Sequence, residues 1–240
     1  MRALEARRAR QRRLFTWLGA AFLAMAATAA IVFAVVSGTG GKNGTTGSHP
    51  ALKLGPLSTL GNLRPAPSPG ANGFEGVPIP PGTPLAGTSS GATGRAVDGI
   101  RCQTNEQLLF HIHSHLTIFV NGAQRQVAGG VGIPGSRVVN SALPGGTCLY
   151  WLHTHAPDGI IHVESPKHRT FTLGDFFDEW GQPLGPSVLG PVQGHVVAIY
   201  NGKLYEGNPR DIPLNAHAQI QLEVGKPLVA PERITFPGNL

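Results

Sequence analysis

The strongest constraint on the fold is the segment from His111 to Val120, which reads His-Ile-His-Ser-His-Leu-Thr-Ile-Phe-Val. Its β-branched and aromatic residues run directly into Asn121-Gly122, a pair that favours the two-residue turn of a β-hairpin. Side chains alternate along a strand, so the three imidazoles share one face and most of the apolar residues share the other. We therefore expect a strand that packs on the core through one face and presents histidines on the opposite face.

A second histidine segment follows about forty residues later, with His153 and His155 before a Pro-Asp-Gly turn and His162 after it. Two registers are possible for this hairpin. A four-residue loop, from Ala156 to Gly159, places His153 opposite His162. A three-residue loop places Thr154 opposite His162 and turns the two earlier histidines to the other face. Proline suits the first position of a turn and glycine suits a bulge, so the order of residues favours the three-residue loop.

Imidazoles at positions i and i+2 of one strand face are suited to binding a common metal ion. Neutral histidines together with a carboxylate are typical ligands of divalent transition metals, and we predict copper or zinc as the cofactor. A blue-copper site is excluded because it needs a free thiolate, whereas the two cysteines of the chain are expected to form a disulfide. The candidate ligands, in descending rank, are His113, His115, His153, His155, His111 and His162, followed by Glu164, His195 and His217.

Two other functions fit the same histidines. One is a binding module without metal, whose polar sheet face recognises a protein partner in the cell envelope. The other is a metal-dependent hydrolase or oxidase, which would need an open coordination position. No residue carries a pattern that identifies it as catalytic: Ser114 lies outside any Gly-x-Ser-x-Gly turn.

Strand and turn signals dominate the remaining sequence. Asn201-Gly202 predicts a second tight hairpin, and alternation over residues 217–224 predicts a final strand. One amphipathic helix is expected from Leu173 to Trp180, with Thr172 as its N-cap and its carboxylates facing solvent. The fold class is therefore mainly β (α+β), a β-grasp-like or β-sandwich domain with a single short helix.

The N-terminus predicts a membrane anchor. The first thirteen residues carry +5 of the formal net charge of +6, so the high pI belongs to this basic tail. Residues 14–36 are uncharged and apolar, long enough as a helix to cross a hydrocarbon core of roughly 30 Å. Positive charge before such a helix predicts a single-pass protein of the cytoplasmic membrane with its N-terminus inside and its C-terminal part outside. A cleaved signal peptide is the alternative. Because the charge precedes an apolar span, we expect the membrane, rather than nucleic acid, as the partner of the tail.

Residues 37–98 are rich in Gly, Pro, Ser and Thr and contain a single aromatic residue, Phe74. Such a composition is typical of a disordered linker. The domain is therefore predicted to span residues 99–240. Within it lie both cysteines of the chain, Cys102 and Cys148. They lack the spacing of a metal-binding Cys-x-x-Cys motif, and an extracytoplasmic location favours a disulfide between them.

Four segments of the predicted domain together resemble a recurring bacterial extracytoplasmic domain that has no established activity. The resemblance implies a bacterial protein that is anchored or exported, and it implies no substrate and no catalytic residues. It is carried by Val97-Asp98-Gly99-Ile100-Arg101-Cys102, His111-Ile112-His113-Ser114-His115, Trp151-Leu152-His153-Thr154-His155 with the following Gly159-Ile160-Ile161-His162-Val163-Glu164-Ser165, and Phe176-Phe177-Asp178-Glu179-Trp180-Gly181.

Overall fold

The computed structural model describes residues 51–88, 93–136 and 145–240. The basic tail predicted over residues 1–13, the membrane helix predicted over residues 14–36 and the beginning of the predicted linker lie outside the described residues. Within the described ranges, no helix has both the length and the apolar character that crossing a bilayer requires.

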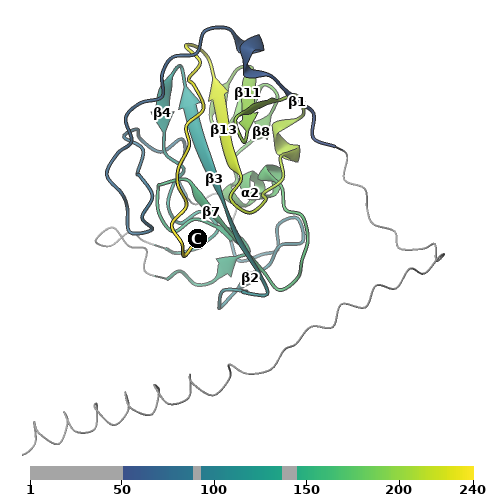
Figure 1. The fold of residues 1–240 in the computed structure, drawn as a ribbon. Coiled ribbons are helices and arrows are strands. Elements are labelled where there is room, and N and C mark those ends of the chain that lie inside the picture. The colour runs from purple at the N-terminus through teal and green to yellow at the C-terminus, as the bar shows by residue number, and fades with distance from the viewer. Residues whose placement is uncertain (1–50, 89–92, 137–144) are drawn as a thin grey trace, which may run out of the picture. The chain divides into compact units, whose positions relative to one another are not determined.

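The described residues form a mainly β domain with one short α-helix, which confirms the predicted fold class (Figure 1). Two short 3-10 helices, η1 (Leu57–Leu60) and η2 (Pro209–Asp211), complete the elements. The strands and the helix are β1 (Leu54–Gly55), β2 (Cys102–Gln103), β3 (Phe110–Val120), β4 (Ala123–Arg125), β5 (Leu149–Tyr150), β6 (Leu152–His153), β7 (Ile160–Ser165), α2 (Leu173–Trp180), β8 (Leu184–Gly185), β9 (Val188–Leu189), β10 (Val192–Gln193), β11 (Val196–Tyr200), β12 (Lys203–Tyr205) and β13 (Gln219–Val224).

The main sheet has the strand order β1-β12-β11-β13-β3-β7-β6, and β4 adds to β3 as a hairpin. Strand β3 lies in the middle of the sheet, parallel to β13 on one side and antiparallel to β7 on the other (Figure 1). Both predicted Asn-Gly turns are present, because Asn121 and Asn201 have φ values of 50° and their glycines have φ values of 73° and 78°. These turns close the β3–β4 and β11–β12 hairpins.

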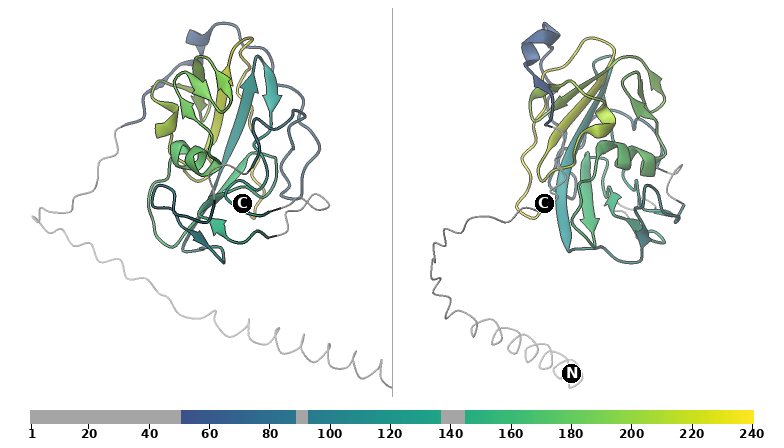
Figure 2. Two further views of the ribbon diagram at one scale, coloured as in Figure 1. Left: turned by 180° about the vertical axis from the view of Figure 1, so that it is seen from behind. Right: turned by 90° about the vertical axis from the view of Figure 1, so that its right-hand side faces the viewer.

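The predicted helix is confirmed from Leu173 to Trp180, and it packs against one face of the sheet (Figure 2). Thr172 accepts a hydrogen bond from the Asp175 backbone, and the Asp175 side chain accepts one from the Thr172 backbone, which completes a capping box. The apolar face of β3 belongs to the same core as the helix. Glu179 departs from the prediction: it was expected on the solvent side of the helix but is fully buried.

The prediction that residues 37–98 are a linker is wrong for the described part of this segment. Its strand β1 pairs with β12 at the edge of the sheet. Further along, Leu85 is 4 % exposed and lies in the main hydrophobic core. The backbone N–H of Leu85 also donates a hydrogen bond to the backbone carbonyl of Gln126, over 2.9 Å. The folded unit therefore includes the described residues from 51 onward, and not only those after Gly99.

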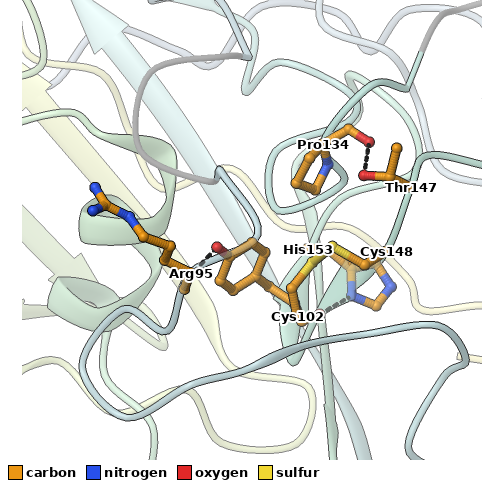
Figure 3. The surroundings of a disulfide bond; sticks show 7 residues. Arg95, Cys102, Pro134, Thr147, Cys148 and His153 are labelled. Carbon is orange, nitrogen blue, oxygen red and sulfur yellow. Dashed lines mark hydrogen bonds between the residues drawn. A yellow bond between two sulfur atoms is a disulfide. The ribbon is translucent and has the colours of Figure 1, made fainter.

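The predicted disulfide between Cys102 and Cys148 is present, and Figure 3 shows its surroundings. It joins β2 to the residue that precedes β5, and these two strands also pair with each other. Residue His153 lies in the same surroundings, five residues after Cys148 (Figure 3). Closing a loop of this length stabilises a fold by about 4 kcal/mol in the chain-entropy model. The disulfide therefore stabilises the region from which β6 and its histidine emerge.

The packing of Leu85 on the domain core can be tested by truncating its side chain. Leu85→Ala in the full-length protein should lower the free energy of unfolding by about 2–5 kcal/mol, because a buried leucine is replaced by a cavity. Urea unfolding followed by circular dichroism measures this loss. The matched control is Leu54→Ala, since Leu54 is 38 % exposed and its truncation should cost no more than about 0.5 kcal/mol. Equal stability of the two variants would show that the segment does not pack on the domain.

Candidate metal centre

A row of histidines crosses three neighbouring strands of the sheet. On the strand pair β3–β7, His113 lies directly opposite His162, and on the pair β7–β6, His162 lies opposite His153. The favoured register, with Thr154 opposite His162, is therefore wrong, and the alternative that pairs His153 with His162 is the observed one. The reason lies in β6, whose residue Leu152 pairs with Val163 and is fully buried in the core. Burial of this apolar pair determines the register more strongly than the preference of the turn.

Four side chains form a first group that could hold a metal ion. Their ligand atoms all lie within 4.8 Å of one another. Nε2 of His153 lies 3.2 Å from Nε2 of His155 and 3.9 Å from Oε1 of Glu164. Oε1 of Glu164 is in turn 3.4 Å from Nδ1 of His162. We call His153, His155, His162 and Glu164 the inner group.

A second group of three histidines shares one member with the inner group. Nε2 of His111 lies 3.1 Å from Nε2 of His113, which lies 3.1 Å from Nδ1 of His162. We call His111, His113 and His162 the outer group. Oε1 of Glu164 is 3.3 Å from Nε2 of His111, so this carboxylate of the inner group also lies next to the outer group.

Hydrogen bonds orient two imidazoles of the inner group. His153 donates its Nδ1–H to the backbone carbonyl of Tyr150 over 2.8 Å, which leaves Nε2 free to bind a cation. His162 donates its Nε2–H to Oε1 of Glu75 over 2.7 Å, which leaves Nδ1 as its ligand atom. Metal-binding histidines in proteins are commonly held in this way, by a carbonyl or a carboxylate on the second ring nitrogen.

Glu75 is the residue of this cluster that the sequence did not reveal. It is buried, and it comes from the segment that was predicted to be a linker. Apart from Asp98, it is the sole acidic residue between residues 37 and 98, which is a weak signal in hindsight. Nothing in a Gly/Pro-rich composition indicates that the segment returns to the sheet at the position of His162.

Burial and mutual repulsion keep most of these imidazoles neutral. Burial, followed by repulsion from His162, lowers the pKa of His113 to about 3. The same causes lower the pKa values of His153 and His155. His162 is the exception: burial alone would lower its pKa, but hydrogen bonds with Glu164 and Glu75 raise it to about 9. At neutral pH the site therefore combines neutral imidazoles with one imidazolium between two carboxylates.

Three candidate ligands do not join either group. His115 donates its Nε2–H to the Asp158 carbonyl over 2.9 Å, and its burial lowers its pKa to about 4, so it stays a neutral part of the core. His195 is exposed and lines a separate cavity near β11 and β12. His217 stacks on Phe236, with ring centroids 4.5 Å apart, and donates to the backbone carbonyl of Leu240.

No family model, no curated protein and no solved structure matches this chain.

The spacing of the ligand atoms suits a tetrahedral ion. Zinc binds imidazole nitrogen at about 2.0–2.1 Å, and two ligands of a tetrahedral ion at that distance are about 3.3 Å apart. The separations of 3.2 Å between His153 and His155 and of 3.4 Å between His162 and Glu164 are close to this value. The separation of 3.9 Å between Nε2 of His153 and Oε1 of Glu164 is longer, so these two atoms would have to move closer together around a bound ion. One oxygen of Glu164, Oε2, is buried without a hydrogen-bond partner among the described residues. A cluster of histidines and a carboxylate with an unpaired buried oxygen could hold a cation, since a bound ion compensates the buried charge.

The raised pKa of His162 predicts how binding depends on pH. An ion can bind Nδ1 only after its proton has left, so below about pH 9 each binding event releases one proton from His162. The apparent affinity for Zn²⁺ should therefore rise about tenfold per pH unit from pH 7 towards 9 and then level off. Competition titrations in chelator-buffered zinc measure this slope.

The matched variant for this titration is Glu75→Gln. Removing one of the two carboxylates that hold the imidazolium should lower the pKa of His162 and move the plateau to lower pH. An affinity that is constant between pH 7 and 9 in the native protein would contradict the assignment of Nδ1 of His162 as a ligand atom.

Proposed function

We propose that this domain binds one divalent transition-metal ion, zinc or copper, at the inner group, on the outer side of the cytoplasmic membrane. The observation that carries the proposal is the convergence of three imidazoles and one carboxylate within 4.8 Å. These side chains come from two neighbouring strands and the turn that joins them, so the backbone of a buried sheet positions them before any ion is present. Such preorganisation reduces the entropy cost of binding.

The donor types favour Zn(II) or Cu(II). Imidazole and carboxylate are borderline and hard ligands, whereas Cu(I) prefers thiolate or thioether sulfur. The two cysteines are joined in a disulfide, and the two methionines of the chain, Met1 and Met25, lie outside the described domain. The described residues therefore offer no free sulfur ligand near the histidines.

The location outside the membrane is supported by two features of the chain. The disulfide between Cys102 and Cys148 fits an oxidising compartment. The basic tail followed by the apolar residues 14–36 fits an anchor with its N-terminus in the cytoplasm. In this proposal the domain handles metal in the bacterial cell envelope.

Metal analysis of the full-length protein tests the proposal. After loading with Zn²⁺ and removal of free ion, we expect one ion per chain in the native protein and loss of that ion in the double variant His153→Ala/His155→Ala. The matched control is His195→Ala, which removes an exposed imidazole outside both groups and should retain the ion.

Thermal unfolding provides the second readout. An ion that binds only the folded state stabilises it by about 2.7 kcal/mol when its concentration is a hundred times the Kd. The melting temperature of the native protein should therefore rise with Zn²⁺ or Cu²⁺ and fall with chelator. A melting temperature that neither reagent changes, with less than one ion per chain, would overturn the proposal and favour a metal-free binding face.

A further inference from the structure

The histidines of the two groups differ in their access to solvent. The His111 side chain is 37 % exposed, whereas Glu164 beside it is 3 % exposed. His113 and His162 are buried, and His153 at the far end of the row has no exposed surface. His111 is therefore the most exposed imidazole of the two groups, His155 is partly exposed, and the other three are buried.

The steps along this row are short enough for one ion to move by exchanging ligands. His111 and His113 have their Nε2 atoms 3.1 Å apart, and His113 is again 3.1 Å from Nδ1 of His162. An ion about 2.0–2.1 Å from each of two such nitrogens is bound by both at the same time. It can therefore acquire the next ligand before it loses the previous one.

The two groups exclude each other because they share one ligand atom. The Nε2–H of His162 is donated to Glu75, so only Nδ1 can bind a metal. One nitrogen lone pair binds one ion, and an ion held by the outer group through Nδ1 prevents the inner group from using it. The outer and inner groups are thus two successive positions for one ion, and Glu164 Oε1 lies close to ligand atoms of both.

The surface around the outer group also suits the entry of a cation. A cavity of about 250 Å³ opens there, and both groups line it together with Glu106. Its lining includes His111 and His113 of the outer group, His155 and Glu164 of the inner group, and the shared His162. Glu106 is exposed, and a carboxylate at the mouth of a cavity attracts a divalent cation. The opposite end of the row, at His153, is closed to solvent.

We propose that His111 and His113 are an entry station, which takes a divalent metal ion from solvent and passes it through His162 to the inner group. The inference rests on the proposed function, because it describes how that site is filled and emptied. The step is a ligand exchange without redox chemistry: the bonds to His111 and His113 break as bonds to His153 and His155 form. The ion leaves by the same residues in reverse.

Stopped-flow loading of the full-length protein tests this route, with Co²⁺ as a probe whose absorbance reports tetrahedral binding. The variant is His111→Gln, which keeps the polar character and removes the imidazole. In this proposal His111 binds the ion on its path but not in the final site. Its removal therefore raises the barrier to loading and release and leaves the free energy of binding unchanged. We therefore expect loading and release to slow by the same factor, on the order of tenfold, with the Kd unchanged.

Two further variants define the controls. His195→Gln removes an exposed histidine outside both groups and should leave loading, release and Kd unchanged. His155→Gln removes an inner ligand and should weaken the Kd mainly through faster release.

Each outcome separates the two proposals. Unchanged loading and release rates in His111→Gln would overturn the entry station, and so would a weakened Kd, which would make His111 a ligand of the final site. In both cases the native protein still binds the ion, and the proposed function stands. Failure of the native protein to bind Co²⁺ or Zn²⁺ would instead overturn the proposed function itself.

Discussion

The interaction on which the site depends is the pairing of three strands in one register, which aligns His113, His162 and His153 across β3, β7 and β6. Shifting either pair by one residue would turn a whole set of side chains to the opposite face. The register is held by the apolar residues on the other side of the sheet, where Leu152 and Val163 are fully buried beside helix α2. The histidine face is thus a consequence of core packing on the opposite face, where helix α2 contributes to the same hydrophobic core as Leu152 and Val163.

The electrostatic environment of the histidines determines which of them carries a proton at neutral pH. Without an ion, burial and the charge on His162 lower the pKa values of His113, His153 and His155 and keep them neutral. His162, between Glu75 and Glu164, favours its protonated form. The proton on His162 occupies the place that a metal ion would take, because both are held by the same nitrogen and the same neighbouring carboxylate. Proton and metal therefore compete for one position, and the domain is built to hold a positive charge there.

Much of the fold follows from local patterns. The two Asn-Gly turns, the capped helix at Leu173 and the disulfide were all predictable, since each depends on residues close in sequence or on a single pair. All four residues of the inner group were also among the predicted ligands, because alternation on a strand is a short-range property. The turn at Pro157 favours the wrong register of the β6–β7 hairpin, since the preference of a turn is weak beside the burial of Leu152. Glu75 and the packing of Leu85 could not be predicted from composition. Proline restricts the unfolded chain and so lowers the ordering cost, and a few buried residues then suffice to dock a segment that looks like a linker.

In the proposed site, the metal ion binds directly to Nδ1 of His162. Anomalous diffraction from crystals of the zinc-loaded full-length protein tests it most directly. We expect a single strong peak about 2.0–2.1 Å from Nδ1 of His162 and within bonding distance of His153, His155 and Glu164. Glu75 should remain hydrogen-bonded to the opposite ring nitrogen of His162. A peak located away from His162, or an ion bound through Nε2 after the contact with Glu75 has broken, would show that Nδ1 of His162 is not the ligand atom.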